Sequence, residues 1–361
     1  MAQATYSIDW DNLLSTTLNA TEGVLYDNIF KGNPFLNKLL MADRVETEDG
    51  GAKLQRTIEY ADGSNYQRVN GYTSIDLTPQ EIITTAIDNW AEAVTTVSIS
   101  RREERSNSGS HQLVNLLTAK MNNASKGFRE GMATDILAPS GASQVAGTNA
   151  CNPLVQLVPI IRSGSAENTT LHGINPTTAT WWKPSTNGRV KSSSSNGTNI
   201  TYTTFKNEIR RAVNGVRADS GEDPNLALGG QLAWEKYVES LEGQVRYAST
   251  DNADMGFRTV VVEGMDFIWD RKMIRVDANA QNTVNYTDTT ATNEEVIYFL
   301  NTDYLYLIFD SESKFKSMGW TQSQNQLARS SIIVCMSQLM TTNRRAHGAL
   351  YGIDTAGNTW S

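Results

Sequence analysis

Two stretches of sequence decide the fold, ADMGFRTVVVEGMDFIWD at residues 253–270 and EEVIYFLNTDYLYLIF at residues 294–309. They contain three apolar runs, at residues 256–262, 265–270 and 296–305, in which β-branched and aromatic residues dominate. Gly, Asp and Asn separate these runs, which is typical of strands joined by tight connections. We therefore expect three strands here.

The composition excludes several classes of protein. The chain has 361 residues, 39% of them hydrophobic, which is enough to fill the core of one large or two ordinary domains. Its net charge is -8, from 39 acidic and 31 basic residues, and no basic domain or stripe is visible. A dedicated nucleic-acid binder would normally carry one, so sequence-specific DNA binding is not expected.

Membrane and secretion signals are also missing from the sequence pattern. The longest apolar run, residues 332–336, is far shorter than the roughly 20 residues that span a bilayer. The first residues carry acids where a signal peptide carries basic residues and an apolar core. With Cys151 and Cys335 as the only cysteines, disulfide stapling is not expected. We expect a protein that matures in a cytoplasm and has no membrane partner.

The N-terminal quarter predicts an arm followed by a hairpin. Residues 1–43 combine a short helix at 22–30 with an apolar anchor at 34–40. Strands are expected at 52–60 and 81–100, joined by a polar connection rich in turn-forming residues. Because an isolated hairpin is marginal in water, such an arm needs a neighbour on which to lie.

A long helix is expected from Ser110 to about residue 137. One buried stripe recurs at three- and four-residue spacing, and Ser110 is a plausible N-cap while Pro139 and Gly141 end the run. The stripe consists of Leu113, Leu116, Leu117, Met121, Ala124, Phe128, Met132 and Ile136. Such a helix would be roughly 40 Å long.

The remainder alternates polar and apolar segments. Residues 138–200 are rich in Ser, Thr, Asn and Gly and predict an extended surface insertion with short strands, such as 154–161. Helices are expected at 204–216 and 231–245, and closing strands at 327–340 and 348–353. In the insertion, Trp181 and Trp182 suit either local packing or a contact with another subunit or a decoration protein.

No motif announces an enzyme, a metal or a cofactor. His111, His172 and His347 have no metal-ligand spacing, and there is no glycine-rich phosphate loop or nucleophile elbow. We therefore expect no enzymatic activity and no cofactor.

Ordered phrases along most of the chain resemble the major capsid proteins of tailed bacteriophages, which have the Hong Kong 97-type fold. The first of these phrases comes from the two stretches quoted at the start, ADMGF with YFLNTDYL, and resembles the sheet of the axial domain in those proteins. The others are Asp27-Asn28-Ile29 with Pro34-Phe35-Leu36, Val97-Ser98-Ile99-Ser100 with Glu103-Glu104, Gln112–Leu117 with Met121–Ala124, and Asn343–Leu350. The resemblance implies an α+β fold.

The resemblance also implies an order of parts. These are an N-arm at 1–43, an E-loop hairpin at 44–100, and a peripheral domain with a long spine helix at 101–137. The insertion at 138–200, an axial domain with mixed sheet and helices at 201–318, and returning peripheral strands and loop at 319–361 follow.

The implied function is architectural. Copies of the chain would form pentamers and hexamers of an icosahedral shell around double-stranded DNA, assembled in the host bacterial cytoplasm. A scaffolding protein, a portal and a decoration or cement protein are the implied partners. The alternatives are an encapsulin-type compartment, which shares the fold, and a β-rich adhesin or carbohydrate-binding protein, which the Thr, Asn and Trp content would suit.

Intersubunit contacts are expected at six residues. Arg101 and Arg102 lie among acids, which favours ion pairing within the subunit or with a neighbour, and Arg344-Arg345 in a turn suits either solvent or an intersubunit salt bridge. The six are Arg68, Tyr72, Arg101, Arg102, Arg344 and Arg345.

Two expectations concern processing. Because the sequence starts with the short arm, we expect a separate scaffolding protein and little or no cleavage of an N-terminal segment. Residues 61–80 contain no lysine, and Arg68 stays protonated, so we expect no covalent cross-link from the hairpin to a neighbour.

Overall fold

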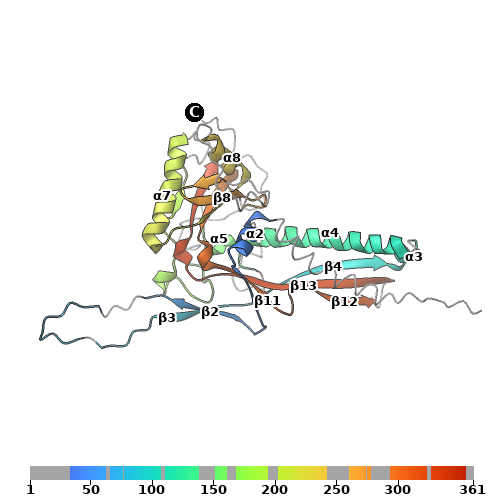
Figure 1. The fold of residues 1–361 in the computed structure, drawn as a ribbon, viewed down its shortest axis with the longest axis horizontal. Coiled ribbons are helices and arrows are strands. Elements are labelled where there is room, and N and C mark those ends of the chain that lie inside the picture. The colour runs from blue at the N-terminus through green and yellow to red at the C-terminus, as the bar shows by residue number, and fades with distance from the viewer. Residues whose placement is uncertain are drawn as a thin grey trace, which may run out of the picture.

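The computed structural model describes residues 33–61, 66–75, 77–106, 110–137, 151–160, 168–193, 202–241, 260–273, 275–277, 293–322 and 327–354. They form three parts (Figure 1): an elongated body, a dome above one end of it, and a hairpin arm that leaves the same end in the opposite direction to the body. The first apolar anchor of the sequence is helix α2 (Pro34–Met41), whereas the expected helix at 22–30 lies outside the described residues.

The body is built around one long strand, β13 (Ala328–Thr341). Along one edge it pairs with the whole length of β4 (Ala91–Ser100), and along the other with β12 (Lys316–Gln322) and then β11 (Leu305–Asp310), all antiparallel. The short strand β1 (Val45–Glu48) completes the five-stranded sheet by pairing in parallel with β11.

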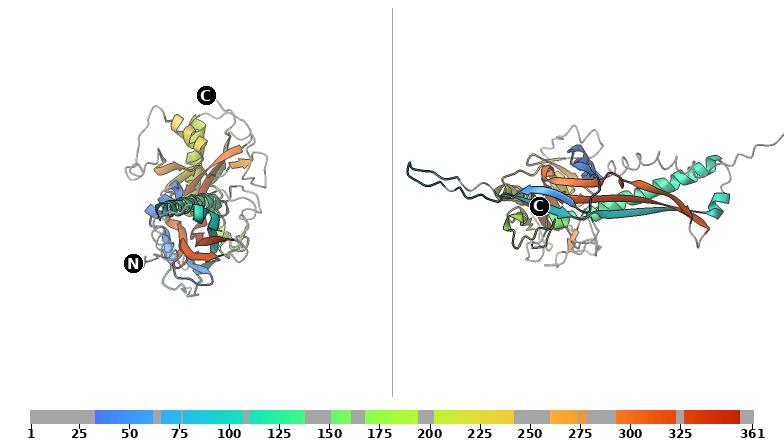
Figure 2. Two further views of the ribbon diagram at one scale, coloured as in Figure 1. Left: turned by 90° about the vertical axis from the view of Figure 1, so that its right-hand side faces the viewer. Right: turned by 90° about the horizontal axis from the view of Figure 1, so that it is seen from below.

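The spine helix α4 (Ser110–Leu137) lies along this sheet, next to β4, as the second view of Figure 2 shows. Its described buried residues recur with helical spacing, as expected for a single buried stripe. They are Met121, Ser125, Phe128, Met132, Ala133, Ile136 and Leu137. A short helix, α3 (Arg101–Ser106), connects β4 to it, and Lys120 fastens the connection by donating to Glu103 at 2.8 Å. The predicted long helix is confirmed.

The dome contains a seven-stranded sheet with helices packed on it. Its strand order is β5-β14-β10-β6-β8-β7, with β9 paired to β10 beyond this path. The strands are β5 (Arg189–Lys191), β6 (Leu226–Gly229), β7 (Val260–Val262), β8 (Met265–Trp269), β9 (Arg275–Asp277), β10 (Asn293–Leu300) and β14 (Gly348–Asp354). The helices α7 (Tyr202–Ser220) and α8 (Gln231–Glu239) lie where helices are expected, but α7 is longer than the predicted 204–216 and α8 ends before the predicted residue 245. Two buried apolar clusters result, one within the dome and one running from the dome into the body.

The strand expected at 296–305 is in fact two strands in different sheets. β10 belongs to the dome and β11 to the body, and the 3-10 turn η3 (Thr302–Tyr304) joins them. The side-chain oxygen of Asn301 accepts the backbone N–H of Asp303 and so caps this turn. One continuous apolar run therefore links dome and body.

The strand expected at 81–100 is also broken, at Asn89 and Trp90. β3 (Ile83–Asp88) pairs with β2 (Leu54–Glu59) in the hairpin, whereas β4 joins the body sheet. The break is held from both sides, since Gln338 donates to the carbonyl of Asn89 at 2.8 Å and the indole of Trp90 donates to the carbonyl of Gly51 at 3.0 Å. We call β2, β3 and the connection at 60–82 the hairpin arm.

The expectation of a surface insertion at 138–200 is wrong for much of its described part. Residues 154–161, expected as a strand, begin with the short helix α5 (Leu154–Leu157), and the 3-10 turn η2 (Thr180–Trp182) follows further on. A short apolar run does not distinguish a strand from a helix by its periodicity. Several of its side chains are at most 2% exposed and belong to the core, namely Leu154, Leu157, Val158, Ile160, Leu171 and Trp182.

Among the described residues, no helix is long and apolar enough to cross a membrane.

Candidate assembly surface

The hairpin arm presents large apolar side chains to solvent. Tyr72 is 106% and Leu77 85% exposed, and the arm projects away from both body and dome (Figure 1). The other exposed apolar residues of the arm are Tyr66, Val69, Ile75, Ile83 and Ile87. Burying one such side chain contributes about 1.5–3 kcal/mol, and contiguous exposed apolar surface usually marks an interaction site.

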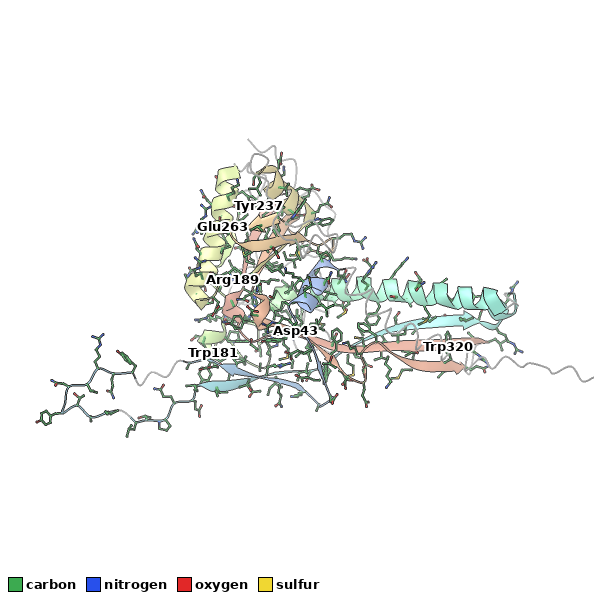
Figure 3. The ribbon with its side chains drawn as sticks, in the orientation of Figure 1. Asp43, Trp181, Arg189, Tyr237, Glu263 and Trp320 are labelled. Carbon is green, nitrogen blue, oxygen red and sulfur yellow. The ribbon has the colours of Figure 1, made fainter. Side chains whose placement is uncertain are left out.

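The base of the arm is held by aromatic and backbone contacts. The ring of Tyr60 stacks on Trp181, with 4.9 Å between the centroids, where β2 ends. On the other strand, the backbone N–H of Ile87 donates to the carbonyl of His172 at 2.9 Å. The turn at His172 and Gly173 has φ of 53° and 74°, a left-handed pair that explains the glycine. Figure 3 shows Trp181 where the arm meets the dome and body.

A buried polar network fixes the last residue of β3. The Nε2 of His172 accepts the backbone N–H of Thr341 at 3.1 Å, so the ring proton lies on Nδ1 and is donated to the carboxylate of Asp88. Asn152 donates to the same carboxylate at 2.7 Å. The arm is therefore tied to β13 through side chains that sequence reasoning did not single out, because they lie far apart in the chain.

Two arginines stabilise the base of the hairpin arm on the side of β1. The guanidinium of Arg56, on β2, pairs with Glu46 and, at 2.9 Å, with Glu48. Arg44 pairs with Asp303 at 2.7 Å, and both guanidinium groups lie over the ring of Tyr306. These partly exposed contacts contribute modestly, about 1 kcal/mol or less each.

The structure places the expected contact residues at different ends of the subunit. Arg68 and Tyr72 are exposed on the arm, whereas Arg101 and Arg102 are exposed at the start of α3, at the far end of the body (Figure 1). These two pairs are not brought together within one chain. Their role between subunits stays a prediction.

Arg344 is not an intersubunit residue, which corrects the expectation. It is 1% exposed, and its guanidinium donates to the carbonyls of Leu157 at 3.1 Å and Gln156 at 2.8 Å. The neighbouring Arg345 is partly exposed and donates to the carbonyl of Thr180 at 2.8 Å. A buried cation needs such partners, and here they come from the end of α5.

A second arginine, Arg189, supports the same segment. It is fully buried and donates to the carbonyls of Ser185 at 2.6 Å and Pro159 at 3.3 Å. Figure 3 shows it at the base of the dome. Arg189 and Arg344 thus hold the chain at 156–159 inside the subunit, and sequence reasoning missed this role.

The body sheet has a second exposed apolar surface. Val94 is 55%, Ile332 37% and Met318 66% exposed. Val94 pairs with Val334 and Ile332 with Thr96, so these residues share the face turned away from the buried side of β4, where Ala91 and Val97 lie. We call Val94, Met318 and Ile332 the outer sheet face. The strand expected at 81–100 includes part of this face, but sequence reasoning did not single out the surface.

Burial keeps two thiols and one imidazole neutral. Burial raises the pKa of the thiols of Cys151 and Cys335 to about 12 and lowers the pKa of His347 to about 3. Among the described residues, no group of three or more His, Cys, Asp or Glu side chains is arranged to hold a metal ion. The described residues therefore combine buried contacts within the subunit with two exposed apolar surfaces, the hairpin arm and the outer sheet face.

Comparison with known proteins gives matches in structure alone. No protein-family model and no curated protein matches the sequence. The capsid of Cyanophage A-1(L) aligns over 88% of this chain and 92% of its own with a TM-score of 0.60 and 14% identity. The capsid of Ralstonia phage GP4 aligns over 87% and 88% with a TM-score of 0.50 and 9% identity. The holo-SrpI encapsulin of Synechococcus elongatus PCC 7942 reaches a TM-score of 0.47 at 8% identity, which is too weak for an argument.

The described residues thus have the α+β, Hong Kong 97-type fold that the resemblance implied.

Proposed function

We propose that this chain is the major capsid protein of a tailed bacteriophage. The observation that carries the proposal is the hairpin arm, which projects from the rest of a subunit with a capsid fold and carries exposed apolar side chains. Among the described residues these side chains remain exposed, and we assign their packing partner to another copy of the chain. Pentamers and hexamers of such subunits would close an icosahedral shell, in which many modest contacts add up.

The outer sheet face is the surface that we assign to a neighbour's arm. It carries Val94, Met318 and Ile332 on strands of the body sheet, whereas the arm extends in the opposite direction to the body (Figure 1). Because the arm extends away from the body, we infer that it does not fold back onto this face within one subunit. The two surfaces meet head to tail between copies, and such contacts generate rings when the rotation closes.

The charge of the chain suits a wall around DNA. A net charge of -8 gives little attraction to phosphates, whereas a strongly basic lining would hold the genome by counterion release. We propose that the shell encloses double-stranded DNA without sequence-specific contacts. Assembly in the host bacterial cytoplasm would involve a scaffolding protein and a portal. Because the arm has no lysine for cross-linking, stability would come from packing of the arm on a neighbour, from salt bridges, or from an added decoration or cement protein.

Self-assembly of the purified protein tests the proposal. We expect closed rings or shells in negative-stain microscopy and a matching increase in light scattering, with or without a co-expressed scaffold. A variant in which residues 61–82 are replaced by a two-residue turn should remain a folded monomer, because β2 and β3 still pair. Monomers of the unaltered protein under all these conditions would contradict the proposal. Particles from infected cells that contain protein cargo instead of DNA would favour the encapsulin-type compartment.

Denaturing gels test the absence of cross-links. The boiled particle should give a single band near 39.8 kDa. A ladder of multimers that survives denaturant and reductant would overturn this part.

A further inference from the structure

The chain contains four Asn-Gly dipeptides, at Asn70, Asn187, Asn196 and Asn214. In such a pair the backbone nitrogen of the glycine can attack the side-chain amide carbon of the asparagine, because no Cβ on the glycine obstructs the approach. Sequence alone ranks the four equally. The structure describes three of them and distinguishes these sharply, while Asn196 lies outside the described residues.

Asn70 and Gly71 are poised for this reaction at the arm's turn. Both are exposed, and the backbone N–H of Gly71 lies 2.9 Å from the Oδ1 of Asn70, so the nitrogen is next to the amide that it would attack. An added Cβ on Gly71 would meet nothing within 4 Å. The turn is closed by the backbone N–H of Thr73, which donates to the carbonyl of Asn70 at 2.7 Å. Solvent reaches the site from all sides.

Asn187 and Gly188 are locked against the same reaction. The side-chain amide of Asn187 donates to the carboxylate of Asp219 at 2.6 Å, which holds it away from the next residue. The backbone N–H of Gly188 is buried and donates to the hydroxyl of Ser185 at 2.8 Å. Neither the nucleophile nor the amide is free to move.

Asn214 and Gly215 are locked by a helix. Both lie inside α7, where each backbone N–H donates to the carbonyl four residues earlier. Gly215 is buried and packs so closely that an added Cβ would lie 2.2 Å from the carbonyl oxygen of Asn187. Ring closure would require the helix to open there.

We propose that Asn70 is a site of spontaneous deamidation that marks unassembled subunits by age. The nitrogen of Gly71 loses its proton to solvent and bonds to Cγ of Asn70, while the Cγ–Nδ2 bond breaks and ammonia leaves. Water then opens the five-membered succinimide ring at either carbonyl. The product is aspartate or isoaspartate at position 70, so water is the only co-reactant and no electrons are transferred.

The modification changes the arm in two ways. It adds a negative charge among Val69, Tyr72 and the other exposed apolar residues of the arm, and burying an unpaired charge against an apolar surface is costly. The isoaspartate form also inserts a carbon into the backbone, which displaces the carbonyl that Thr73 bonds. If the arm docks on a neighbour, as the proposed function has it, modified subunits assemble less well and assembled ones are shielded.

Peptide mapping of the full chain tests the site. The protein is kept dilute and unassembled in mildly alkaline buffer, then digested with trypsin, which releases residues 69–101. Mass spectrometry follows conversion of the amide to the acid, and fragment ions separate Asn70 from Asn89 in the same peptide. We expect conversion at Asn70 on the order of tenfold faster than at Asn187 or Asn214. Equal rates at Asn70 and Asn187 would overturn the proposal.

Two controls isolate the cause. In Gly71→Ala the fold is unchanged, because the added methyl meets open space, and conversion should slow on the order of tenfold. An unchanged rate would show that the Gly71 nitrogen is not the nucleophile and overturn the assignment. In urea the rates at Asn70, Asn187 and Asn214 should converge, and a persisting tenfold difference would attribute the selectivity to sequence instead of structure.

Assembled particles separate this inference from the proposed function. Slower conversion at Asn70 in particles than in free subunits supports both the site and the docking of the arm. Fast conversion in free subunits and in particles alike supports the site and counts against arm docking. Incubating Asn70→Asp with unaltered protein should give particles depleted in the variant, and equal incorporation would overturn the role of the modification as an age mark.

Discussion

The indole ring of Trp181 stacks on the ring of Tyr60 with 20° between their planes, at the point where the hairpin arm leaves the body. Trp181 is itself supported by Trp182, which is 1% exposed and donates from its indole nitrogen to the carbonyl of Leu171 at 3.2 Å. A segment expected to be a surface insertion therefore sets the direction of the arm.

Replacing Trp181 with alanine should loosen the arm without unfolding the subunit. The stacked pair contributes about 0.5–1.5 kcal/mol beyond its burial, and β2 and β3 remain paired. We expect a small loss of thermal stability, faster protease cleavage in the arm, and particles that are fewer or irregular in size. Limited proteolysis and microscopy measure these effects.

Trp182→Ala is the matched control for that change. Its side chain is buried in the core, so its truncation should cost about 3–5 kcal/mol and lower the stability of the monomer itself. If both variants lost the same stability, the separate role of Trp181 at the arm would be wrong.

Arg344→Met should destabilise the isolated subunit by about 2–4 kcal/mol. The change leaves the buried carbonyls of Leu157 and Gln156 without the guanidinium that satisfies them. Urea unfolding of unassembled protein measures the loss. Arg345→Met, which removes one contact from a partly exposed side chain, should stay within about 1 kcal/mol. Equal effects of the two changes would show that burial of Arg344 does not matter.

The protein should lose stability in acid through His347. Burial lowers the pKa of His347 from 6.5 to about 3, so between these values the unfolded chain binds a proton that the folded chain refuses. This contribution is complete above pH 6.5 and falls by about 1.4 kcal/mol per pH unit as the pH drops toward 3. Unfolding by urea at a series of pH values measures the slope.

His347→Gln tests the assignment of that slope. The Nδ1 of His347 accepts the backbone N–H of Asn301, and its Nε2 faces the hydroxyl of Thr341. Glutamine offers one acceptor and one donor for the same partners but does not titrate. The acid slope between pH 6 and 4 should therefore become shallower by about 1 kcal/mol per unit, and an unchanged slope would assign it to other groups.

Two glycines in helices should respond in opposite directions to alanine. Gly127 lies on the exposed side of α4 with nothing within 4 Å of an added Cβ, so Gly127→Ala should stabilise the subunit by about 0.5–1 kcal/mol. Gly215→Ala in α7 would press against the backbone of Asn187 and should destabilise by about 1–3 kcal/mol. Thermal denaturation distinguishes the two.

Leu77→Asp should abolish assembly and leave the monomer intact. Leu77 is 85% exposed, so a charge there costs the isolated subunit less than about 0.5 kcal/mol. In an apolar interface the same charge is expensive. Sedimentation of the variant should show monomers with an unchanged melting temperature, and normal particles would place Leu77 outside the interface.

The sequence predicts best where local pattern and tertiary structure agree. The stripe that includes Met121, Phe128 and Met132 predicts α4 because a helix with one buried face repeats every 3.6 residues. Strands were likewise expected at 327–340 and 348–353, where β13 and β14 lie.

The sequence predicts the structure worst where residues far away in the chain determine the burial or the conformation of a segment. Nothing near Arg344 in sequence shows that carbonyls at 156 and 157 will surround it, so the pattern left only solvent exposure or an intersubunit salt bridge as interpretations. The break at Asn89 and Trp90 likewise depends on Gln338 and Gly51. The sequence predicts the projecting arm, but the contacts that Trp181 and His172 make with it are visible only in the folded structure.

The length of β13 determines how the subunit carries a mechanical load. Ten of its residues, from Ala328 to Ser337, pair with β4, while the other edge is shared between β12 and β11. Bonds in an antiparallel ladder lie perpendicular to the strands, so a pull along β13 strains the whole row at once instead of opening it one bond at a time. Outward pressure on a shell stretches its wall in the plane. When this tension acts along β13, the strands separate only if the hydrogen bonds of the entire row break together.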